Sequence, residues 1–414
     1  MSHPSAILAL TRRRFLRNLG IAGFGAFAKA CSEAAPVARS ETIKMPFANG
    51  QRLLVTFPQK RPLILLTTRP PQLETPFSIF NQGLLTPNDA FFVRYHLAQV
   101  PVSIEPDAFQ LSIKGTVNTP MMFSMADLKT KFTPFELIAV NQCSGNGRGF
   151  SIPRVAGGQM GNGAMGNALW KGARLKDVLN KAGLGAGAKQ VTFKGMDSPV
   201  VQKTPDFVKA LEVEQALDED TLLAYEMNAE PLPMLNGFPL RLVVPGYYGT
   251  YWVKHLNEIT VLSEPFDGYW MNPAYRVPDN ACACIEFGSA PSKTRPITRY
   301  NVRSFITSLS DGRQVTVGRQ LTIRGIAFDG GYGITQVLFS EDAGKNWRQA
   351  HLGKDAGRYS FREWTTPFTP QRRGIFQLQV KATNRIGQSQ PLEALWNPAG
   401  YMRNVVETVS VNAA

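Results

Sequence analysis

The pattern of hydrophobic and polar positions changes near residue 290, and different structures are predicted on either side of that point. Before it, short apolar runs alternate with glycine-rich loops, and residues 135–140 and 240–244 are each predicted to form a buried strand. Within residues 175–182 the apolar side chains recur at i, i+3, i+4 and i+7, and Gly183 follows them. That spacing predicts an amphipathic helix with a glycine C-cap, so the first region is predicted to be α+β.

The second region consists of short segments in which apolar and polar residues alternate, most clearly in residues 376–383. Two strand-like segments, 337–340 and 347–350, flank residues 342–345 (DAGK), which have the composition of a hairpin turn. Residues 405–411 are predicted to form the last strand. Because no helical periodicity interrupts these segments, they predict a β-sandwich of about 120 residues.

Composition is that of an ordinary globular protein, with 43% hydrophobic and 18% charged residues, and 414 residues are enough for two domains. The formal net charge is +14. Because residues 1–30 carry five basic side chains and no acidic one, +9 remains on the rest of the chain, which favours anionic partners. A nucleic-acid partner is not expected, since there is no run of basic residues with interleaved aromatics.

Residues 1–30 are predicted to be an export signal rather than part of the fold. Arginines at positions 12–14 precede a weakly apolar stretch, 19–28, that is shorter than the roughly 20 residues needed to span a bilayer. This pattern is typical of a twin-arginine signal, which exports folded proteins to the periplasm, and a frayed basic terminus is the alternative. Residues 31–45, rich in Ala, Pro and Ser, are predicted to be a linker, and Cys31 leaves lipid attachment open.

The four cysteines, Cys31, Cys143, Cys282 and Cys284, do not have the spacing of a disulfide framework. The separation of Cys282 and Cys284 is awkward for a disulfide between them, so both are predicted to be buried thiols. The chain has no C-x-x-C-H sequence and is therefore not expected to attach a c-type haem itself. With four histidines and no C-x-x-C or H-E-x-x-H sequence, a zinc site is not expected either.

Cys143 is the strongest candidate for chemistry in the chain. It follows the predicted strand 135–140 and lies in residues 141–149 (NQCSGNGRG), a loop with three glycines. Glycine lets the backbone approach a bound group closely, and Arg148 can favour the thiolate or bind an anion. A thiolate is also a soft ligand for a transition metal. The alternative is a buried, inert cysteine beside a tight turn.

Other candidates suit an anionic ligand. Arg94 and His96 point to the same side of an extended segment, because side chains alternate along a strand, and together they suit an oxyanion or phosphate. Arg241 and Lys254 lie at the ends of a strand and a glycine-turned loop, where either can clamp a phosphate. Tyr275 lies between prolines in a constrained loop. Taken singly, these residues are also explained as a sheet-edge pair, surface charges and core packing.

Residues 161–166 match the G-x-G-x-x-G sequence of dinucleotide-binding loops, but nicotinamide binding is not expected. No apolar strand run precedes the glycines, and no acidic residue follows about 20 positions later in a β-α-β context. A flexible loop around a cofactor or the core is the better interpretation.

Five segments in series resemble the sulfite oxidase family of mononuclear molybdenum enzymes, from about residue 84 to the C-terminus. They are residues 92–96 (FVRYH), 142–148 (QCSGNGR), 163–167 (GAMGN), 223–228 (LAYEMN) and 237–246 (GFPLRLVVPG). Residues 249–255 (GTYWVKH) and 265–275 (PFDGYWMNPAY) are similar to the bacterial periplasmic sulfite dehydrogenases of this family. Those enzymes pass electrons to a c-type cytochrome, so the resemblance places the electron acceptor on another polypeptide.

The resemblance implies a role for each matched residue. Cys143 would bind molybdenum beside the dithiolene of one molybdopterin. The substrate pocket would be formed by Arg94, Arg148, Tyr275 and, approaching it, Arg403. The pterin would be held by Phe92, His96, Asp197, Asn236, Arg241, Trp252, Val253 and Lys254. The family often has His at the position of Asn236, which can still donate a hydrogen bond there.

The resemblance also implies a molybdopterin-binding oxidoreductase domain over residues 46–288 and an immunoglobulin-like domain over residues 289–414. The second domain is often used for dimerisation, so a homodimer or heterodimer is expected. The expected activity is oxidation of sulfite to sulfate, because converging arginines attract a small anion. Alternatives are the oxidation of sulfane on a carrier protein, the reduction of nitrate or sulfoxides, and a non-catalytic adhesion protein built on the sandwich.

Overall fold

Strands make up most of the regular structure in residues 41–414, which are the residues that the computed structural model describes. The α-helices in this range are short: α1 (Met125–Thr130), α2 (Leu175–Ala182) and α3 (Val213–Ala216). None of the described helices is long and apolar enough to cross a bilayer. The predicted export signal and most of the predicted linker lie outside the described residues. The α+β class is confirmed, with a small helical share.

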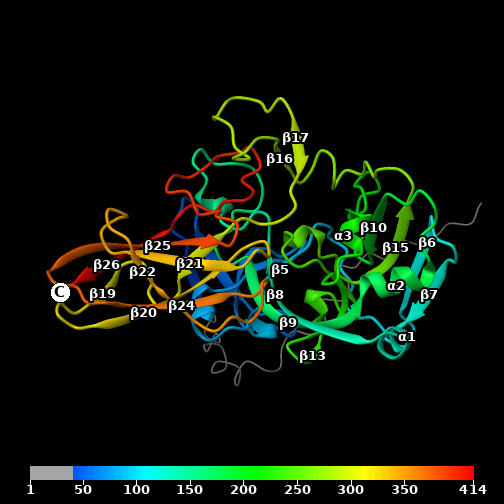
Figure 1. The fold of residues 1–414 in the computed structure, drawn as a ribbon, viewed down its shortest axis with the longest axis horizontal. Coiled ribbons are helices and arrows are strands. Elements are labelled where there is room, and N and C mark those ends of the chain that lie inside the picture. Colours follow the sequence, from blue (N-terminus) through cyan, green and yellow to red (C-terminus); the bar gives the residue numbers. More distant parts are fainter. Residues whose placement is uncertain (1–40) are drawn as a thin grey trace, which may run out of the picture. The chain divides into compact units, whose positions relative to one another are not determined.

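Three sheets build the first region (Figure 1). The first has the order β1 (Thr42–Lys44), β2 (Gln51–Val55), β3 (Leu63–Thr67), β4 (Gln72–Glu74), β5 (Val93–Arg94). The second has the order β11 (Val208–Glu212), β10 (Gln190–Gly195), β15 (Leu256–Leu262), β6 (Gln110–Gly115), β7 (Met121–Ser124). The third has the order β13 (Glu230–Pro231), β12 (Leu222–Met227), β9 (Met165–Arg174), β8 (Pro134–Gln142), with β14 (Arg241–Val243) also paired to β12.

The third sheet positions the cysteine loop. Strand β8 contains the predicted buried run 135–140 and pairs antiparallel with β9 along its whole length, from Pro134 opposite Ala173 to Gln142 opposite Met165. The last four residues of β8 are buried, as expected of a strand that ends inside the molecule. Cys143 therefore follows directly after the buried end of a fully paired strand and does not lie on a surface loop.

Local sequence signals set the helix ends. All four apolar residues of the predicted helix 175–182 are buried, and Gly183 caps α2 with a φ of +69°, a conformation that glycine adopts without a Cβ clash. Helix α1 begins at a capping box in which Ser124 and Asp127 satisfy each other's backbone amides. Between the larger elements lie short 3-10 turns: η1 (Phe77–Asn81), η2 (Asn88–Ala90), η3 (Arg148–Phe150), η4 (Met234–Asn236) and η5 (Gly249–Tyr251).

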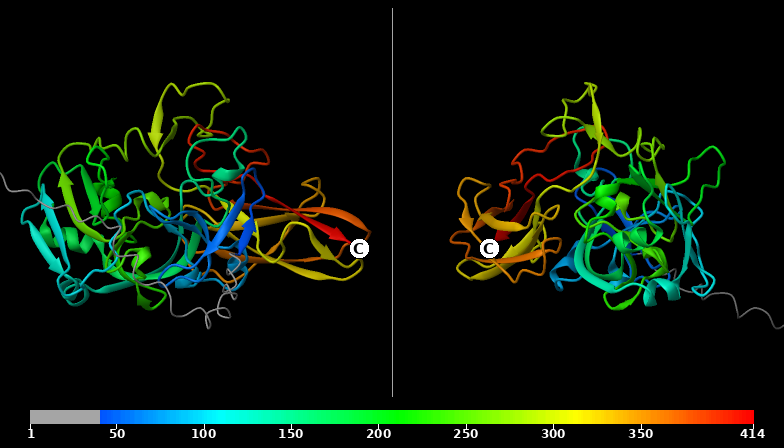
Figure 2. Two further views of the ribbon diagram at one scale, coloured as in Figure 1. Left: turned by 180° about the vertical axis from the view of Figure 1, so that it is seen from behind. Right: turned by 45° about the vertical axis from the view of Figure 1, so that its right-hand side comes forward.

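The C-terminal region is the predicted β-sandwich (Figures 1 and 2), preceded by the two-stranded pair β16 (Arg276–Pro278) and β17 (Thr294–Pro296). One sheet has the order β18 (Arg303–Ile306), β20 (Leu321–Phe328), β24 (Arg362–Phe368), β23 (His351–Leu352). The other has the order β19 (Arg313–Val315), β26 (Thr408–Ala413), β25 (Gly374–Asn384), β21 (Ile334–Ser340), β22 (Arg348–Gln349). The predicted hairpin is confirmed by the pairing of β21 with β22, whereas the last strand begins later than predicted, at Thr408.

The two regions pack against each other through a shared core. A separate apolar cluster fills the interior of the sandwich, around the fully buried Trp364. Phe305, Phe328 and Phe361 of the sandwich strands and turns instead belong to the large cluster of the first region. Burying these rings across the junction stabilises the sandwich against the first region, so the junction is a fixed part of the fold.

Candidate functional site

A cavity lies beside the Cys143 loop. Segments far apart in the sequence line it: Phe92, Arg94, His96, Asn141, Cys143, Ser144, Phe207, Leu235, Asn236, Arg241, Gly249, Thr250, Trp252, Lys254 and Tyr275. All of the predicted site residues line it except Arg148, Arg403, Asp197 and Val253. Cys143 is half-buried and is the free cysteine of the described residues.

The predicted Arg94 and His96 pair both face this cavity, and Tyr275 joins them. His96 Nε2 and the Tyr275 hydroxyl are hydrogen-bonded, and the His96 ring stacks on Phe207 with centroids 3.8 Å apart. Burial, together with the charges of Arg94, Lys254 and Lys209, lowers the pKa of His96 well below its usual value. The imidazole is therefore neutral and shares a hydrogen bond with the tyrosine hydroxyl.

Tyr275 itself is held in an uncommon backbone conformation. Its φ is +59°, in the left-handed region that non-glycine residues rarely occupy. Its ring stacks on that of Tyr401, with centroids 5.4 Å apart and planes within 10°. Burial raises the pKa of Tyr275, which keeps the hydroxyl protonated. Strained backbone conformations of this kind cluster at active sites and ligand-binding sites, where the surrounding structure holds them in place.

Arg241 and Lys254 form a cationic wall, so the alternative that they are surface charges is wrong. Arg241 is 4% exposed, packs against the rings of Trp170 and Trp252, and donates from Nη1 to the backbone oxygen of Asn236 at 2.9 Å. Lys254 Nζ donates to the backbone oxygen of Arg94 at 2.7 Å. Burial, followed by the charge of Arg241, lowers the pKa of Lys254 to about 7. Among residues 41–414 neither charge has a carboxylate at hydrogen-bond distance, although the charge of Asp197 raises the pKa of Lys254, and an anion in the cavity would supply further counter-charge.

Several polar atoms that border the cavity are buried and have no hydrogen-bond partner within residues 41–414. They are both amide atoms of Asn141, Ser144 Oγ, Thr250 Oγ1 and Arg241 Nε. Leaving one such group unsatisfied costs about 1–3 kcal/mol, so a set of them around one cavity points to a polar ligand that completes their bonds. The residues present thus fit a large anionic group that carries several hydrogen-bonding atoms.

Four predicted residues lie outside the cavity lining. Arg148 Nε donates to the backbone oxygen of Ala399 at 2.9 Å, and its guanidinium lies over the Tyr401 ring at 4.9 Å. Arg403 is paired with Glu407 at 3.1 Å. The other two are Asp197, which is buried and whose pKa is raised mainly by that burial, and Val253, a core residue.

Two buried lysines escaped the sequence analysis. Lys60 bonds the side-chain oxygen of Asn236, and burial lowers its pKa to about 7. Lys209 is 1% exposed, donates to the Trp270 backbone oxygen at 2.6 Å, and lies 4.8 Å from the centre of the Tyr275 ring. No sequence signal distinguishes either lysine from a surface residue. Phe207, Asn141 and Thr250 were also missed, although the last two lie within or beside recognised motifs.

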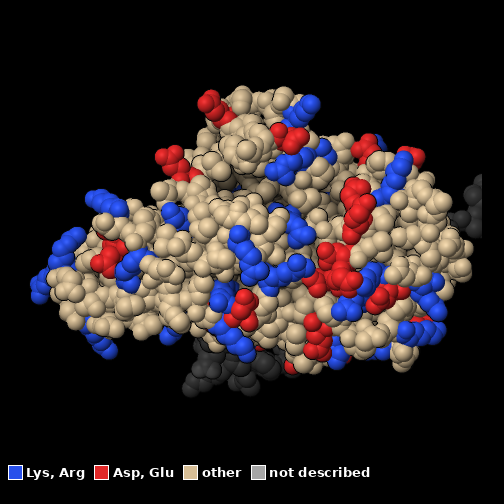
Figure 3. Space-filling view, viewed as in Figure 1, with Lys and Arg blue, Asp and Glu red and all other residues tan. Residues whose placement is uncertain are grey.

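Buried positive charge is therefore a feature of the site. On the face shown in Figure 3, basic and acidic side chains are mixed. The prediction for Cys282 and Cys284 is wrong, because they form a disulfide and Cys282 is exposed. The turn at residues 280–284 brings the two Cα atoms to 5.1 Å, within disulfide range despite the short separation.

The loop 161–166 has a structural role that its glycines explain. Gly161 and Gly163 donate their backbone amides to the carboxylate of Glu74 at 2.9 and 2.7 Å. A Cβ on Gly163 would lie 2.0 Å from the Thr75 backbone oxygen, so no larger residue fits. Strand β9, not a helix, follows this loop, and the arrangement of a dinucleotide-binding turn is absent from residues 161–174.

Comparisons with known proteins agree with this architecture. Residues 97–270 match the oxidoreductase molybdopterin binding domain, and residues 294–414 match the Mo-co oxidoreductase dimerisation domain. The mitochondrial sulfite oxidase of Macaca fascicularis is 33% identical over 86% of this chain and 67% of that protein. The sulfite oxidase of Arabidopsis thaliana is 30% identical over 86% of this chain and 96% of that protein.

A solved structure has the same fold. The sulfane dehydrogenase SoxCD from Paracoccus pantotrophus superposes with a TM-score of 0.71 at 23% identity, over 94% of this chain and 93% of that one. The chain spans about two thirds of the length of the animal relatives it matches. It belongs to the sulfite oxidase family of molybdopterin oxidoreductases, as its motifs predicted.

Proposed function

We propose that this protein oxidises sulfite to sulfate at a mononuclear molybdenum–molybdopterin centre, with Cys143 as the protein's ligand to the metal. The observation that carries the proposal is the convergence of Arg94, Arg241 and Lys254 on a cavity that also contains the free thiol. The reaction consumes one water for each sulfite and releases two protons and two electrons with the sulfate. When bound, the cofactor supplies the oxygen transfer and accepts the two electrons.

The cationic wall would hold the cofactor's phosphate and pterin. Arg241 and Lys254 supply charge, and the side chains of Asn236, Thr250 and Asn141 supply hydrogen bonds from positions lining the cavity. The unpartnered atoms of Asn141, Thr250 and Arg241 support this assignment. Lys60 takes part indirectly, because its ammonium bonds Asn236 and fixes the orientation of that amide.

Arg94, His96 and Tyr275 would act on the substrate. The guanidinium of Arg94 attracts and orients the small anion in a site with little competing water. The Tyr275 hydroxyl and the neutral His96 form a hydrogen-bonded pair that would orient the bound anion. Arg148 supports Tyr275 indirectly. Its guanidinium packs on the Tyr401 ring, which in turn stacks on the Tyr275 ring.

We also propose the surroundings in which this chemistry takes place. Electrons would pass to a c-type cytochrome, which this chain does not carry as a C-x-x-C-H site. The sandwich would support a homodimer or a heterodimer with that cytochrome. The arginines at positions 12–14 would direct the folded, cofactor-loaded protein to the periplasm. Replacing Arg12 and Arg13 with Lys should leave the protein in the cytoplasmic fraction, and unchanged export would refute that part.

Sulfite-dependent reduction of ferricyanide by the molybdenum-loaded protein tests the activity without the partner. Rapid turnover is expected, and Cys143→Ser should abolish it. The double variant Cys282→Ser/Cys284→Ser is the matched control, since it removes a disulfide whose two cysteines do not line the cavity and should retain turnover. Absence of sulfite turnover in protein that contains molybdenum would refute sulfite as the substrate, and sulfane, nitrate and sulfoxides would be assayed next.

A further inference from the structure

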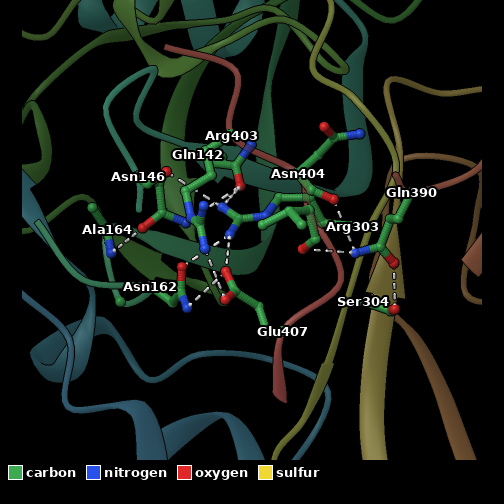
Figure 4. Close-up of polar contacts among 12 residues, drawn as sticks. Gln142, Asn146, Asn162, Ala164, Arg303, Ser304, Gln390, Arg403, Asn404 and Glu407 are labelled. Atoms are coloured by element: carbon green, nitrogen blue, oxygen red, sulfur yellow. Dashed lines mark hydrogen bonds and ion pairs between the residues drawn. The ribbon is translucent and has the colours of Figure 1, made fainter. Parts of the chain in front are cut away.

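A cluster of polar side chains joins the Cys143 loop to the C-terminal sandwich (Figure 4), and Arg303 lies at its centre. Arg303 is the first residue of β18, and its side chain is 1% exposed. Its Nη1 donates to the side-chain oxygen of Gln142 at 3.2 Å and to the backbone oxygen of Asn146 at 3.5 Å. Its Nη2 donates to Asn162 Oδ1 at 2.9 Å. One guanidinium from the sandwich therefore contacts residues on both sides of Cys143.

The charge of Arg303 is balanced within the same cluster. Glu407 Oε1 lies 3.5 Å from Arg303 Nη2, and its other oxygen accepts from Arg403 at 3.1 Å. Asn162 Nδ2 donates to the same carboxylate at 3.3 Å. A buried charge that loses its partners is strongly destabilising, so these residues keep the guanidinium in one place. The arrangement is planar and bridging, which an ammonium group does not reproduce.

The loop around Cys143 is also held by hydrogen bonds that do not involve Arg303, among them the Asn146 amide to the Cys143 backbone oxygen at 3.0 Å and the Gly147 amide to the Gly161 backbone oxygen at 2.6 Å. The Cys143 amide donates to the Ala164 backbone oxygen at 2.9 Å, and the Ala164 amide donates to Asn146 Oδ1 at 3.0 Å. The Ser144 backbone oxygen accepts from the Met402 amide at 3.3 Å. Support on one side of the loop comes from β9 and the turn before it, and on the other from the C-terminal segment. Among the charged residues described, Arg303 alone bonds the Gln142 side chain and the Asn146 backbone oxygen across the junction.

We infer that Arg303 is a positioning residue for the thiolate of Cys143: by bonding Gln142 and Asn146 together, it fixes the direction in which Sγ enters the cavity. The sandwich is thus part of the metal site rather than only a surface for association. The inference rests on the proposed function solely in taking Cys143 as the metal ligand. Groups that orient a metal ligand change the ligand's geometry and the metal's properties without touching substrate.

Arg303→Lys tests this role, because it keeps the charge and removes the bridging geometry. In the loaded full-length enzyme, kcat should fall about tenfold or more, as is usual when a ligand's support is lost. KM should stay within about twofold of the original value, because no substrate contact is removed. The electron paramagnetic resonance spectrum of the one-electron-reduced enzyme should shift, since it reports the geometry at the metal ligand.

A second readout uses the full-length chain produced without cofactor, in a Cys31→Ser background, and does not involve activity. The rate at which iodoacetamide alkylates Cys143 should change several-fold in Arg303→Lys relative to the parent, because the loop loses its anchor. This rate does not depend on sulfite. If the protein proves inactive toward sulfite, the alkylation result still decides the role of Arg303.

Ser304→Ala is the matched control. Ser304 is the next residue of β18, is fully buried, and bonds Val380 and Gln390 inside the sandwich rather than the loop (Figure 4). It should leave the alkylation rate, the spectrum and kcat unchanged. Equal changes in Ser304→Ala would overturn the inference, because general loosening of the sandwich would then explain them. A parental spectrum and alkylation rate in Arg303→Lys would overturn it as well.

If Arg303→Lys does not fold, Asn162→Ala decides the question. This substitution removes the acceptor at 2.9 Å from Nη2 and the Asn162 donor to Glu407, and it keeps the guanidinium and the Glu407 carboxylate themselves. It should alter the alkylation rate and the spectrum in the same direction as expected for Arg303→Lys, by a smaller factor. Parental behaviour of a folded Asn162→Ala protein would then reject the positioning role.

Discussion

Replacing the buried Lys209 with Met should stabilise the cofactor-free protein near neutral pH while reducing its activity once loaded. Burial lowers the pKa of Lys209 from 10.5 to about 7, and burial is the sole cause. At about 1.4 kcal/mol per pH unit, this difference of about 3.5 pH units corresponds to roughly 5 kcal/mol of lost stability at neutral pH. Met fills a similar volume and carries no charge.

The gain is partly offset by interactions that Lys209 makes. Its hydrogen bond to the Trp270 backbone oxygen is worth about 1 kcal/mol, and its contacts with the Tyr251 and Tyr275 rings add about 1–2 kcal/mol. Near pH 7 the variant should therefore be more stable by about 2–3 kcal/mol. Between about pH 7 and pH 10.5 the unfolded parental chain binds the extra proton, so parental stability rises with pH in that window. The variant lacks this rise and should be the less stable protein above about pH 10.

Thermal unfolding of both cofactor-free proteins between pH 6.5 and 10.5, followed by calorimetry, measures this crossover. The loaded variant should turn over sulfite more slowly, because Tyr275 loses the neighbouring cation that packs on its ring. A variant that is less stable than the parent at every pH would refute the reasoning. It would mean that the contacts of Lys209 fully offset the free-energy cost of burying its charge.

Three further outcomes are expected. Gly249→Ala should lower the molybdenum content of purified protein, because a Cβ there would lie 2.5 Å from Asn141 Oδ1 beside the cavity; normal content would argue against a cofactor at that position. Arg241→Met should leave the protein folded, because the substitution removes a buried charge that has no carboxylate partner among the described residues. Metal analysis should show a low molybdenum content, and full occupancy would exclude Arg241 as a residue that anchors the cofactor. Mass spectrometry of unreduced peptides should show Cys282 joined to Cys284, and two alkylated thiols instead would contradict the fold of that turn.

Sequence pattern alone was sufficient for the elements whose signals are local. Helix α2 follows from four apolar residues at helical spacing and a glycine cap, and β8 follows from a short apolar run ahead of the glycine-rich loop. The motif around Cys143 was recognisable because its residues are consecutive. Most of the residues implied by the family resemblance do line one cavity, since each is carried by a segment with its own strong pattern.

The tertiary structure decided which isolated polar residues enter the site and which turn away. Lys60 and Lys209 look like surface lysines in the sequence, and only packing of distant segments buries them beside Asn236 and Tyr275. Arg148 lies within the cysteine motif, yet its guanidinium donates a hydrogen bond to the backbone oxygen of Ala399, 251 residues away in the sequence.

Arg303 shows the same limit most clearly. It lies 161 residues from Gln142, in a region whose alternating pattern predicts a sandwich and nothing about chemistry. A local pattern encodes which face of a segment is buried, because that depends on the period of its own backbone. It does not encode what the buried face meets, because that partner is chosen by the packing of the whole chain.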